Sequence, residues 1–314
     1  MAELFIELFS EEIPAKLQID ARRKLKEIIN EKLKKKEINF KSSKSFSTPT
    51  RLVFVIDGIP EKIKLSKKII KGPNINAPQT ALEGFIKSRN LKKSDVYKKK
   101  IDKGEFYFAE IKSGEIDVLK ELSLIIPEAF RAYSWKKSMK WSFYEMVWGR
   151  PLKSIVCLLD NKIINFDYFH LKSGNTTLVN TINEYQSKKV SGYKSYLKIL
   201  QSNDIILDQE KRKKIILNKM NRVCNSKKLK KYFNDKLVEE VVNLVDNPNV
   251  IIGKFNQIYL EVPQEILIIS MEYHQKYFPL FDYKDELTNL FLLVSNSVDK
   301  KGYIKIGNQR VIEA

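Results

Sequence analysis

The sequence predicts an α+β protein with more than one domain, in which mixed or antiparallel sheets pack against helices. Three observations support this prediction. The chain has 314 residues, which exceeds the usual size of one domain. Apolar residues alternate with period two in some segments and recur at helical spacing in others. Predicted helices are mixed with predicted hairpins rather than alternating regularly with strands, which favours α+β over α/β.

The beginning of the chain predicts a strand, a helix and a second strand. Residues 4–9 alternate in a pattern typical of a strand that is covered on both faces. Pro14 is suited to begin a helix, because its missing N–H would be unpaired in the first turn anyway. Lysines at 34–36 suit the end of that helix, where the dipole is negative. Residues 52–56 predict the second strand.

The segment up to residue 172 predicts further helices and strands. Helical spacing covers 80–87 and 116–132, and Pro127 is expected to break or restart the second of these helices. Three more strands are predicted at 105–111, 154–159 and 163–171.

A change in composition near Ser173 predicts a domain boundary. We expect N-terminal α+β structure in 1–172 and a second α+β domain in 173–314, with a helical segment at about 195–246. The last residues continue a helical pattern without a turn signal. We therefore expect a fragment that is truncated at its C-terminal end.

Within the second domain, Asp208 and Asp235 are predicted to cap helices, the latter with an apolar face formed largely by valines. The remaining predicted elements are a strand at 250–252, a helix from Pro263 to about Phe278, and a strand at 290–294.

The charge of the chain makes nucleic acid the first partner class to consider. The net charge is +19, from 57 Lys and Arg against 38 Asp and Glu. Such a surplus attracts polyanions. The surplus is mostly lysine in a chain also rich in Asn and Ile, and genome-wide compositional drift produces the same result. Charge alone leaves both explanations open.

Cysteine usage and hydropathy predict the compartment. Cys157 and Cys224 have no CxxC spacing, which is not typical of a disulfide scaffold or a zinc site. The sequence contains no apolar run of about 18 residues and does not begin like a signal peptide. We expect a cytoplasmic protein without a membrane partner.

Motifs of common catalytic sites are absent from the sequence. It contains no GxxxxGK[ST], GxGxxG or GxSxG pattern and no metal-ligand cluster. The two histidines are His170 and His274. His274 falls on a helical apolar stripe with Leu267, Met271 and Phe278, so we expect a hydrogen-bonded core residue rather than an acid or base.

The carboxylates of Glu7, Glu11 and Glu12 could suggest acid–base catalysis, but a simpler explanation is favoured. Glu11 and Glu12 precede a predicted helix, where negative charge is favourable. Glu272 and Lys276 are spaced to form a surface pair on one helix. No catalytic residue and no metal site are predicted.

Two basic segments allow either RNA binding or a structural role. Trp135, Trp141 and Trp148 lie among lysines, an arrangement that could stack on bases and neutralise phosphates. Large rings more often fill a core or a domain junction, which we favour here. The basic helix 211–222 could follow a phosphate backbone or form a solvated face.

Several of these segments resemble the bacterial glycyl-tRNA synthetase beta-subunit family. Residues 4–16, LFIELFSEEIPAK, are similar to that family's opening LLLEIGTEELPAK, and FSTPTRL at 46–52 is similar to FATPRRL. Further matches follow in the same order over nearly the whole chain: KGP at 71–73, ALEGF at 81–85, KSMKW at 137–141, GRP at 149–151, the stretch 266–279 ending in HQKYFP, VSN at 294–296 and GNQRV at 307–311.

The chain also departs from the family pattern. Phe9 and Ser10 replace a Gly-Thr pair, and LVNTI at 178–182 stands where the family has a GHRF-like stretch. Thr50 and Lys140 replace arginines. A lysine cannot copy the bidentate contact of an arginine, so such a contact is in doubt at Lys140.

The resemblance implies the beta subunit of a glycine–tRNA ligase. Family members are about twice this length, so an anticodon-recognising C-terminal half would be missing here. A partner alpha subunit, similar to the class II synthetase core, would bind ATP, Mg²⁺ and glycine, and this chain would hold no cofactor. The beta subunit would bind and position tRNA(Gly) within a tetramer of two alpha and two beta subunits. The alternative is a free-standing RNA-binding protein or structural scaffold without a ligase role.

Basic residues are the predicted contacts to tRNA or to the partner subunit. Some lie in or beside the matched motifs, whereas Lys211 and Arg212 rest on charge alone. The predicted set is Arg51, Lys71, Lys136, Lys140, Arg150, Lys211, Arg212 and Lys276.

Overall fold

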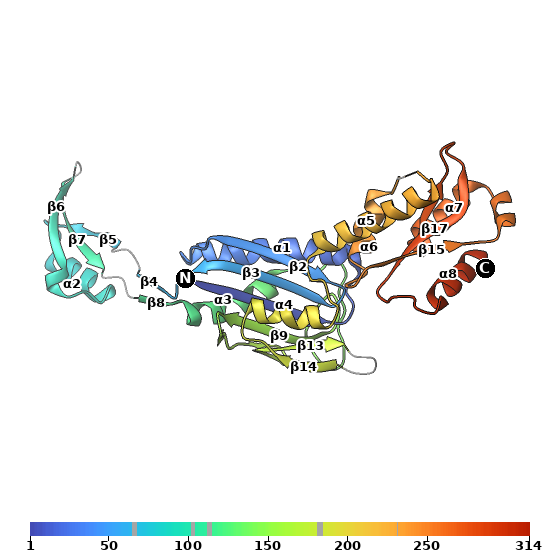
Figure 1. Ribbon diagram of the computed structural model, residues 1–314. Helices are drawn as coiled ribbons and strands as arrows, with labels where there is room; N and C mark the ends of the chain where they lie inside the picture. Colours follow the sequence, from blue (N-terminus) through green and yellow to red (C-terminus); the bar gives the residue numbers. More distant parts are fainter. Residues whose placement is uncertain (65–67, 102–103, 112–114, 181–184, 231) are drawn as a thin grey trace. The chain divides into compact units, whose positions relative to one another are not determined.

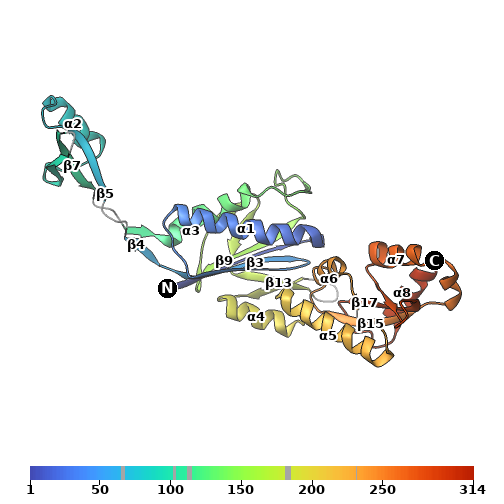
Figure 2. The same cartoon turned by 90° about the horizontal axis from the view of Figure 1, so that it is seen from above.

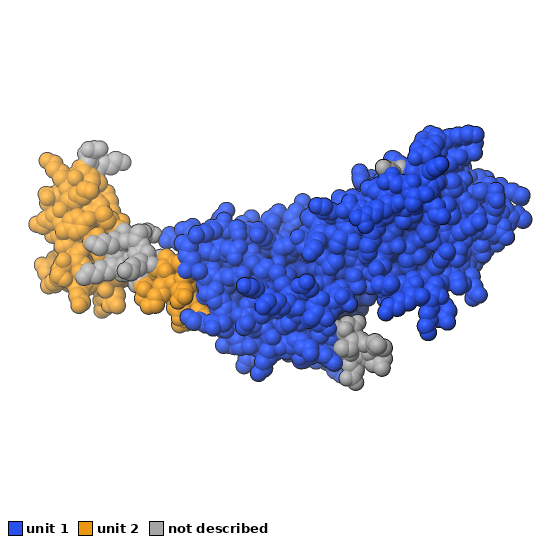
Figure 3. Space-filling view, in the orientation of Figure 1, with its two compact units in different colours: residues 1–59, 122–314 blue, residues 60–121 orange. Residues whose placement is uncertain are grey.

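The computed structural model confirms the α+β class (Figure 1). It forms two compact units, coloured separately in Figure 3: unit 1 comprises residues 1–59 and 122–314, and unit 2 comprises residues 60–121. The boundary predicted near Ser173 stays a prediction. The residues described are 1–64, 68–101, 104–111, 115–180, 185–230 and 232–314.

The main sheet of unit 1 has the strand order β11-β12-β9-β1-β3-β2, and β10 pairs with β9. Its neighbouring strands are antiparallel except β12 and β9, which are parallel. The central strand β1 is buried on both faces, as its apolar alternation predicts. The strands are β1 Ala2–Ser10, β2 Ser42–Thr48, β3 Arg51–Ile59, β9 Leu152–Leu159, β10 Lys162–Ile163, β11 Asp167–Tyr168 and β12 Leu171–Gly174.

Helices cover both faces of this sheet. Figures 1 and 2 show α1 (Ala15–Lys35) and α3 (Val118–Ala132, residues 122–132 in unit 1) on one face and α4 (Tyr193–Ser202) on the other. Tyr196 of α4 packs in one core with Phe5 of β1. Burial of both sheet faces explains why β1 contains almost no exposed side chain.

A three-stranded antiparallel sheet, β15-β17-β16, forms the C-terminal part of unit 1. The valine face of α6 and one face of α5 pack against one side, and α7, η3 and α8 pack against the other. The elements are α5 Gln209–Lys227, α6 Asp235–Val242, β15 Asn249–Lys254, η2 Gln257–Glu261, α7 Gln264–Ile269, the π-helix η3 Ser270–Gln275, β16 Phe278–Phe281, β17 Leu287–Ser295 and α8 Tyr303–Glu313.

Unit 2 is a small sheet with one longer helix. Its three-stranded antiparallel sheet has the order β5-β7-β6, and β4 pairs with β8 separately. The elements are β4 Lys62–Lys64, β5 Lys68–Asn74, α2 Gln79–Ser88, η1 Lys93–Asp95, β6 Val96–Ile101, β7 Gly104–Ile111 and β8 Glu115–Asp117.

Local sequence rules predicted several helix starts and faces correctly. Pro14 immediately precedes α1. Asp208 caps α5, because its carboxylate accepts from the backbone N–H of Glu210 at 2.9 Å. The valines of α6 are buried as expected, including Val238 and Val242. These features depend on neighbours in the sequence, so they are visible without the tertiary fold.

Three predictions about elements were wrong. Pro127 lies inside α3, which continues through it because buried side chains such as Ile126 and Phe130 hold the helix in place. The segment predicted as one strand at 163–171 forms three short strands instead. Asn234, not Asp235, caps α6. A hairpin, β13 Thr176–Asn180 with β14 Tyr185–Lys189, follows β12 and has no counterpart among the predicted elements.

The prediction for His274 was also wrong. Met271 is fully buried as expected, but His274 is exposed. The chain changes from α-helix to π-helix at Ser270, and the wider turn moves the next buried position to Tyr277. The predicted pair between Glu272 and Lys276 does not form, because each binds a partner on or beside α6.

In the parts of the chain that the structure describes, no helix is both long and apolar enough to span a bilayer.

Candidate functional site

Arg51 lies in the core of unit 1 rather than on its surface. The side chain is 2% exposed, and its Nε lies 3.2 Å from the Glu7 carboxylate. The same carboxylate accepts hydrogen bonds from the hydroxyls of Thr177, at 2.9 Å, and Tyr196, at 2.7 Å. Burial and the Glu7 charge raise the pKa of Tyr196 well above its ordinary value, so its hydroxyl remains a donor. This network joins β1, β3, β13 and α4.

The Arg51 network also reaches the segment that departs from the family pattern. The guanidinium donates to the carbonyl of Leu178. Thr181 and Ile182 of the same departure lie outside the described residues.

Arg212 is completely buried and holds together three segments of unit 1. Its guanidinium donates to backbone carbonyls of Val242 at 3.1 Å, Ile206 at 2.6 Å, Leu207 at 2.8 Å and Ser47 at 2.8 Å. Burial lowers the pKa of Arg212 to about 10, which still leaves it protonated at neutral pH. An RNA contact therefore does not fit Arg212 or Arg51, because both cations are inside the protein and already bonded.

The loop 133–151 between α3 and β9 is here called the tryptophan loop. Two of its three tryptophans anchor it in the core. Trp148 is 1% exposed and Trp135 is 8% exposed, and their rings pack at 5.1 Å. A side chain at Gly149 would meet the Trp135 ring at 2.5 Å, which explains a glycine at this position. These two tryptophans belong to the core, as favoured above.

The remainder of the tryptophan loop presents aromatic side chains to solvent. Phe143 is fully exposed, and Tyr144 is 40% exposed. The Tyr144 ring stacks on His170 at 3.6 Å with an interplanar angle of 12°. Trp141 is half-buried and meets the edge of the same imidazole. An exposed phenylalanine beside a stacked pair offers flat faces to a base or to an apolar partner.

The tryptophan loop also carries four cations. Lys137 and Lys140 are exposed. Lys136 is 68% exposed and its ammonium lies 3.9 Å from Asp20 of α1. Arg150 is half-buried and donates to the carbonyl of Gly149. The tryptophan loop therefore combines exposed rings and lysines, which suits contact with a phosphate backbone and unpaired bases.

Asp20 links α1 to this loop. Tyr133 donates to its carboxylate at 3.3 Å, and Lys24 lies 3.3 Å away. Burial alone would raise the pKa of Asp20, but the hydrogen bond from Lys24 and the charge of Lys136 outweigh it, so the pKa is lowered.

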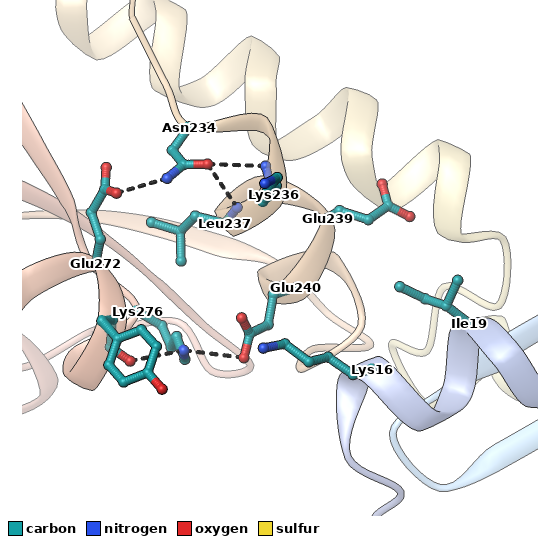
Figure 4. Close-up of a pocket in the computed structure, with 10 residues that line it drawn as sticks. Lys16, Ile19, Asn234, Lys236, Leu237, Glu239, Glu240, Glu272 and Lys276 are labelled. Carbon is teal, nitrogen blue, oxygen red and sulfur yellow. Dashed lines mark hydrogen bonds and ion pairs between the residues drawn. The ribbon is translucent and has the colours of Figure 1, made fainter. Parts of the chain in front are cut away.

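Lys276 borders a cleft of about 460 Å³ between α1, α6 and η3 (Figure 4). Its ammonium lies 3.1 Å from Glu240 and donates to the carbonyl of Tyr273 at 2.9 Å. Figure 4 shows Lys16 directed toward the same Glu240 carboxylate. On the other side, the Asn234 amide donates to the Glu272 carboxylate at 2.7 Å.

The charges that line this cleft largely compensate one another. Lysines 16, 236 and 276 face glutamates 239, 240 and 272, so the cleft offers little net attraction to a phosphate. Lys276 connects η3 to α6, and its predicted contact with tRNA or a partner stays a prediction.

The remaining predicted contacts lie elsewhere. Lys211 is exposed in the first turn of α5. Lys71 is exposed in unit 2, with its ammonium 3.5 Å from the centre of the Phe106 ring. Of the predicted set, Lys136, Lys140 and Arg150 share one segment, the tryptophan loop.

Phe143, Tyr144 and His170 were not predicted as site residues. His170 is distant in sequence from the loop and meets Tyr144 only through the fold. Among the described residues, no three His, Cys, Asp or Glu side chains gather as a metal site would require.

Comparison with known proteins identifies the family. The family model described as "Glycyl-tRNA synthetase beta subunit" matches residues 4–314. The glycine–tRNA ligase beta subunit of Rickettsia peacockii (strain Rustic) is 38% identical over 315 residues, covering 100% of this chain and 47% of that protein. The corresponding protein of Rickettsia felis is 37% identical over 318 residues, covering 100% of this chain and 48% of that protein. The chain therefore spans about half the length of these curated relatives, and it belongs to the glycyl-tRNA synthetase beta subunit family.

Proposed function

We propose that this chain acts within the beta subunit of a glycine–tRNA ligase. It would bind and position tRNA(Gly) in the cytoplasm for ATP-dependent aminoacylation by an alpha subunit, in a tetramer of two alpha and two beta subunits. ATP and Mg²⁺ would be bound by the alpha subunit. The family match along residues 4–314 supports the ligase assignment.

The observation that carries the RNA-binding role is the exposed part of the tryptophan loop. Phe143, the stacked Tyr144 and the exposed lysines belong to one segment that two buried tryptophans anchor. Anchoring limits the conformational entropy that the loop loses when it binds. The lysines would neutralise phosphates, and the rings would contact bases.

Removal of two loop cations tests this role in the assembled enzyme. We compare glycine charging by the alpha subunit with full-length beta subunit carrying Lys137→Gln and Lys140→Gln. The control variant, Lys34→Gln with Lys35→Gln, removes the same charge at the exposed C-terminal end of α1. We expect the loop variant to raise KM for tRNA several-fold and to leave KM for glycine unchanged. Equal effects of the two variants on KM for tRNA would contradict a role for this loop.

A further inference from the structure

One face of the sheet in unit 2 gathers aromatic and basic side chains from all three strands. Side chains of directly opposed residues in antiparallel strands lie on the same face. In the central strand β7, Phe106 opposes Lys99 of β6, and Phe108 opposes both Tyr97 of β6 and Lys71 of β5. These five residues, with Ile69 of β5, form what we call the open face.

The other face of this sheet is covered by helix α2. A side chain at Gly72 would meet the Phe85 ring of α2 at 2.8 Å, so the helix lies on the side opposite to that of Lys71. Ala109 alternates with Phe108 and is fully buried, in agreement with a covered face. On the open face, Ile69 is 55% exposed and Tyr97 is 40% exposed.

The rings and cations of the open face are in contact. The Tyr97 and Phe108 rings are 6.3 Å apart and nearly parallel, at 26°. Lys71 places its ammonium 3.5 Å from the centre of the Phe106 ring, and Lys99 lies 5.9 Å from that of Phe108. The lysines thus lie among the rings. A bound base and its phosphate would therefore meet both kinds of group at once.

Charge favours an anionic occupant for this face. Residues 60–121 contain 15 Lys and Arg against 9 Asp and Glu. Glu110 lies at one end of the open face, opposite Ile69 in the register. A purely apolar partner would leave Lys71 and Lys99 to be desolvated without a counter-charge, which is costly.

We propose that the open face is a binding platform for unpaired nucleotides of RNA. A broad sheet surface cannot enter the narrow groove of an RNA duplex, but unstacked bases can lie flat on its rings. Tyr97 and Phe108 would stack with bases, and Lys71 and Lys99 would hold the adjacent phosphates. This inference deepens the proposed function and rests on it, because it assigns the single-stranded parts of the bound RNA to unit 2.

Two pairs of variants of the 314-residue chain distinguish the contribution of ring stacking to RNA binding from that of general positive charge. Lys71→Gln with Lys99→Gln removes two cations from the open face. Lys98→Gln with Lys100→Gln removes two exposed cations that the register places on the other face. Tyr97→Ala removes a stacking ring, and Tyr97→Phe retains it.

The affinity for a fluorescent eight-nucleotide RNA and for an RNA duplex of equal length is measured by anisotropy at several salt concentrations. We expect Tyr97→Ala to weaken single-strand binding by about 5- to 150-fold, with Tyr97→Phe close to the unmodified chain. We expect the open-face lysine variant to lower the log–log salt slope by about 0.7 for each lost phosphate contact, and the control pair to change it little. Duplex affinity should respond to neither Tyr97 variant.

Photo-cross-linking of a 4-thiouridine RNA then locates the bound strand. Cross-links in 96–108 support the proposal. Binding with cross-links confined to the tryptophan loop, and equal effects of the two lysine pairs, would overturn it while leaving the proposed function intact. Absence of RNA binding even at low salt would overturn both this inference and the proposed function. Binding of an apolar peptide, but not of RNA, to the open face would identify a protein-binding site instead.

Discussion

Replacement of Arg212 by methionine should destabilise unit 1 strongly without changing its surface. Methionine is a long, flexible side chain that can occupy much of the same buried space but cannot donate a hydrogen bond. Four carbonyls, those of Ser47, Ile206, Leu207 and Val242, then lose the donor that satisfies them. Three segments of the chain lose their common connection.

The magnitude follows from two opposing contributions. Hydrogen bonds that involve a charged group contribute about 1.5–3 kcal/mol each, whereas burial of a cation costs several kcal/mol. Each buried carbonyl left without a donor costs about 1–3 kcal/mol, and the relief of burying the cation offsets part of that sum. We therefore expect a net loss of about 3–5 kcal/mol for Arg212→Met. A domain of marginal stability, about 5–15 kcal/mol, would lose a large part of it.

Urea unfolding followed by far-UV circular dichroism measures this change. Lys211→Met is the matched control, because the neighbouring lysine is exposed in the same turn of α5 and should shift the unfolding free energy by no more than about 0.5 kcal/mol. Arg212→Lys should fall between the two, since an ammonium reaches fewer of the carbonyls. A loss below about 1 kcal/mol for Arg212→Met would refute the role of this network.

Two further predictions concern packing and pH. Gly253→Ala should lower the unfolding free energy by about 1–3 kcal/mol, because the new methyl group would overlap the buried Phe291 ring. Gly307→Ala should raise the unfolding free energy by about 0.5–1 kcal/mol, because this position in α8 has open space around it. Similar changes in urea midpoint for both would disprove this packing argument. Asp20→Asn should flatten the fall in stability at acidic pH. Although burial opposes it, Lys24 chiefly lowers the folded-state pKa of Asp20. The carboxylate therefore stabilises the fold above its unfolded pKa near 3.8, and this contribution is lost as the pH falls through the folded-state pKa. Parallel pH profiles of unfolding for the two proteins would show that Asp20 does not carry this dependence.

Features set by neighbouring residues could be predicted from the sequence. Pro14 at the start of α1, the Asp208 cap and the buried valines of α6 each depend on spacing within a few residues. The strand β1 was predictable because apolar residues on both sides of its alternation require cover on both faces. The positions of these elements follow from local rules of capping and periodicity.

Features set by distant pairing could not be predicted. Charge suggested that Arg212 contacts RNA, but the carbonyls of β2 and α6 enclose it. The apolar stripe predicted that His274 is buried, but the π-helical turn leaves it exposed. Tyr97 and Phe108 meet across strands whose register no single segment reveals, so the open face is visible only in the structure.

Glycine charging of tRNA(Gly) by the matching alpha subunit, with and without the full-length beta subunit that contains this chain, tests the central claim most directly. We predict negligible charging by the alpha subunit alone and restored charging when the beta subunit is added. Equal charging in both reactions would contradict the proposal that this chain positions tRNA for the ligase.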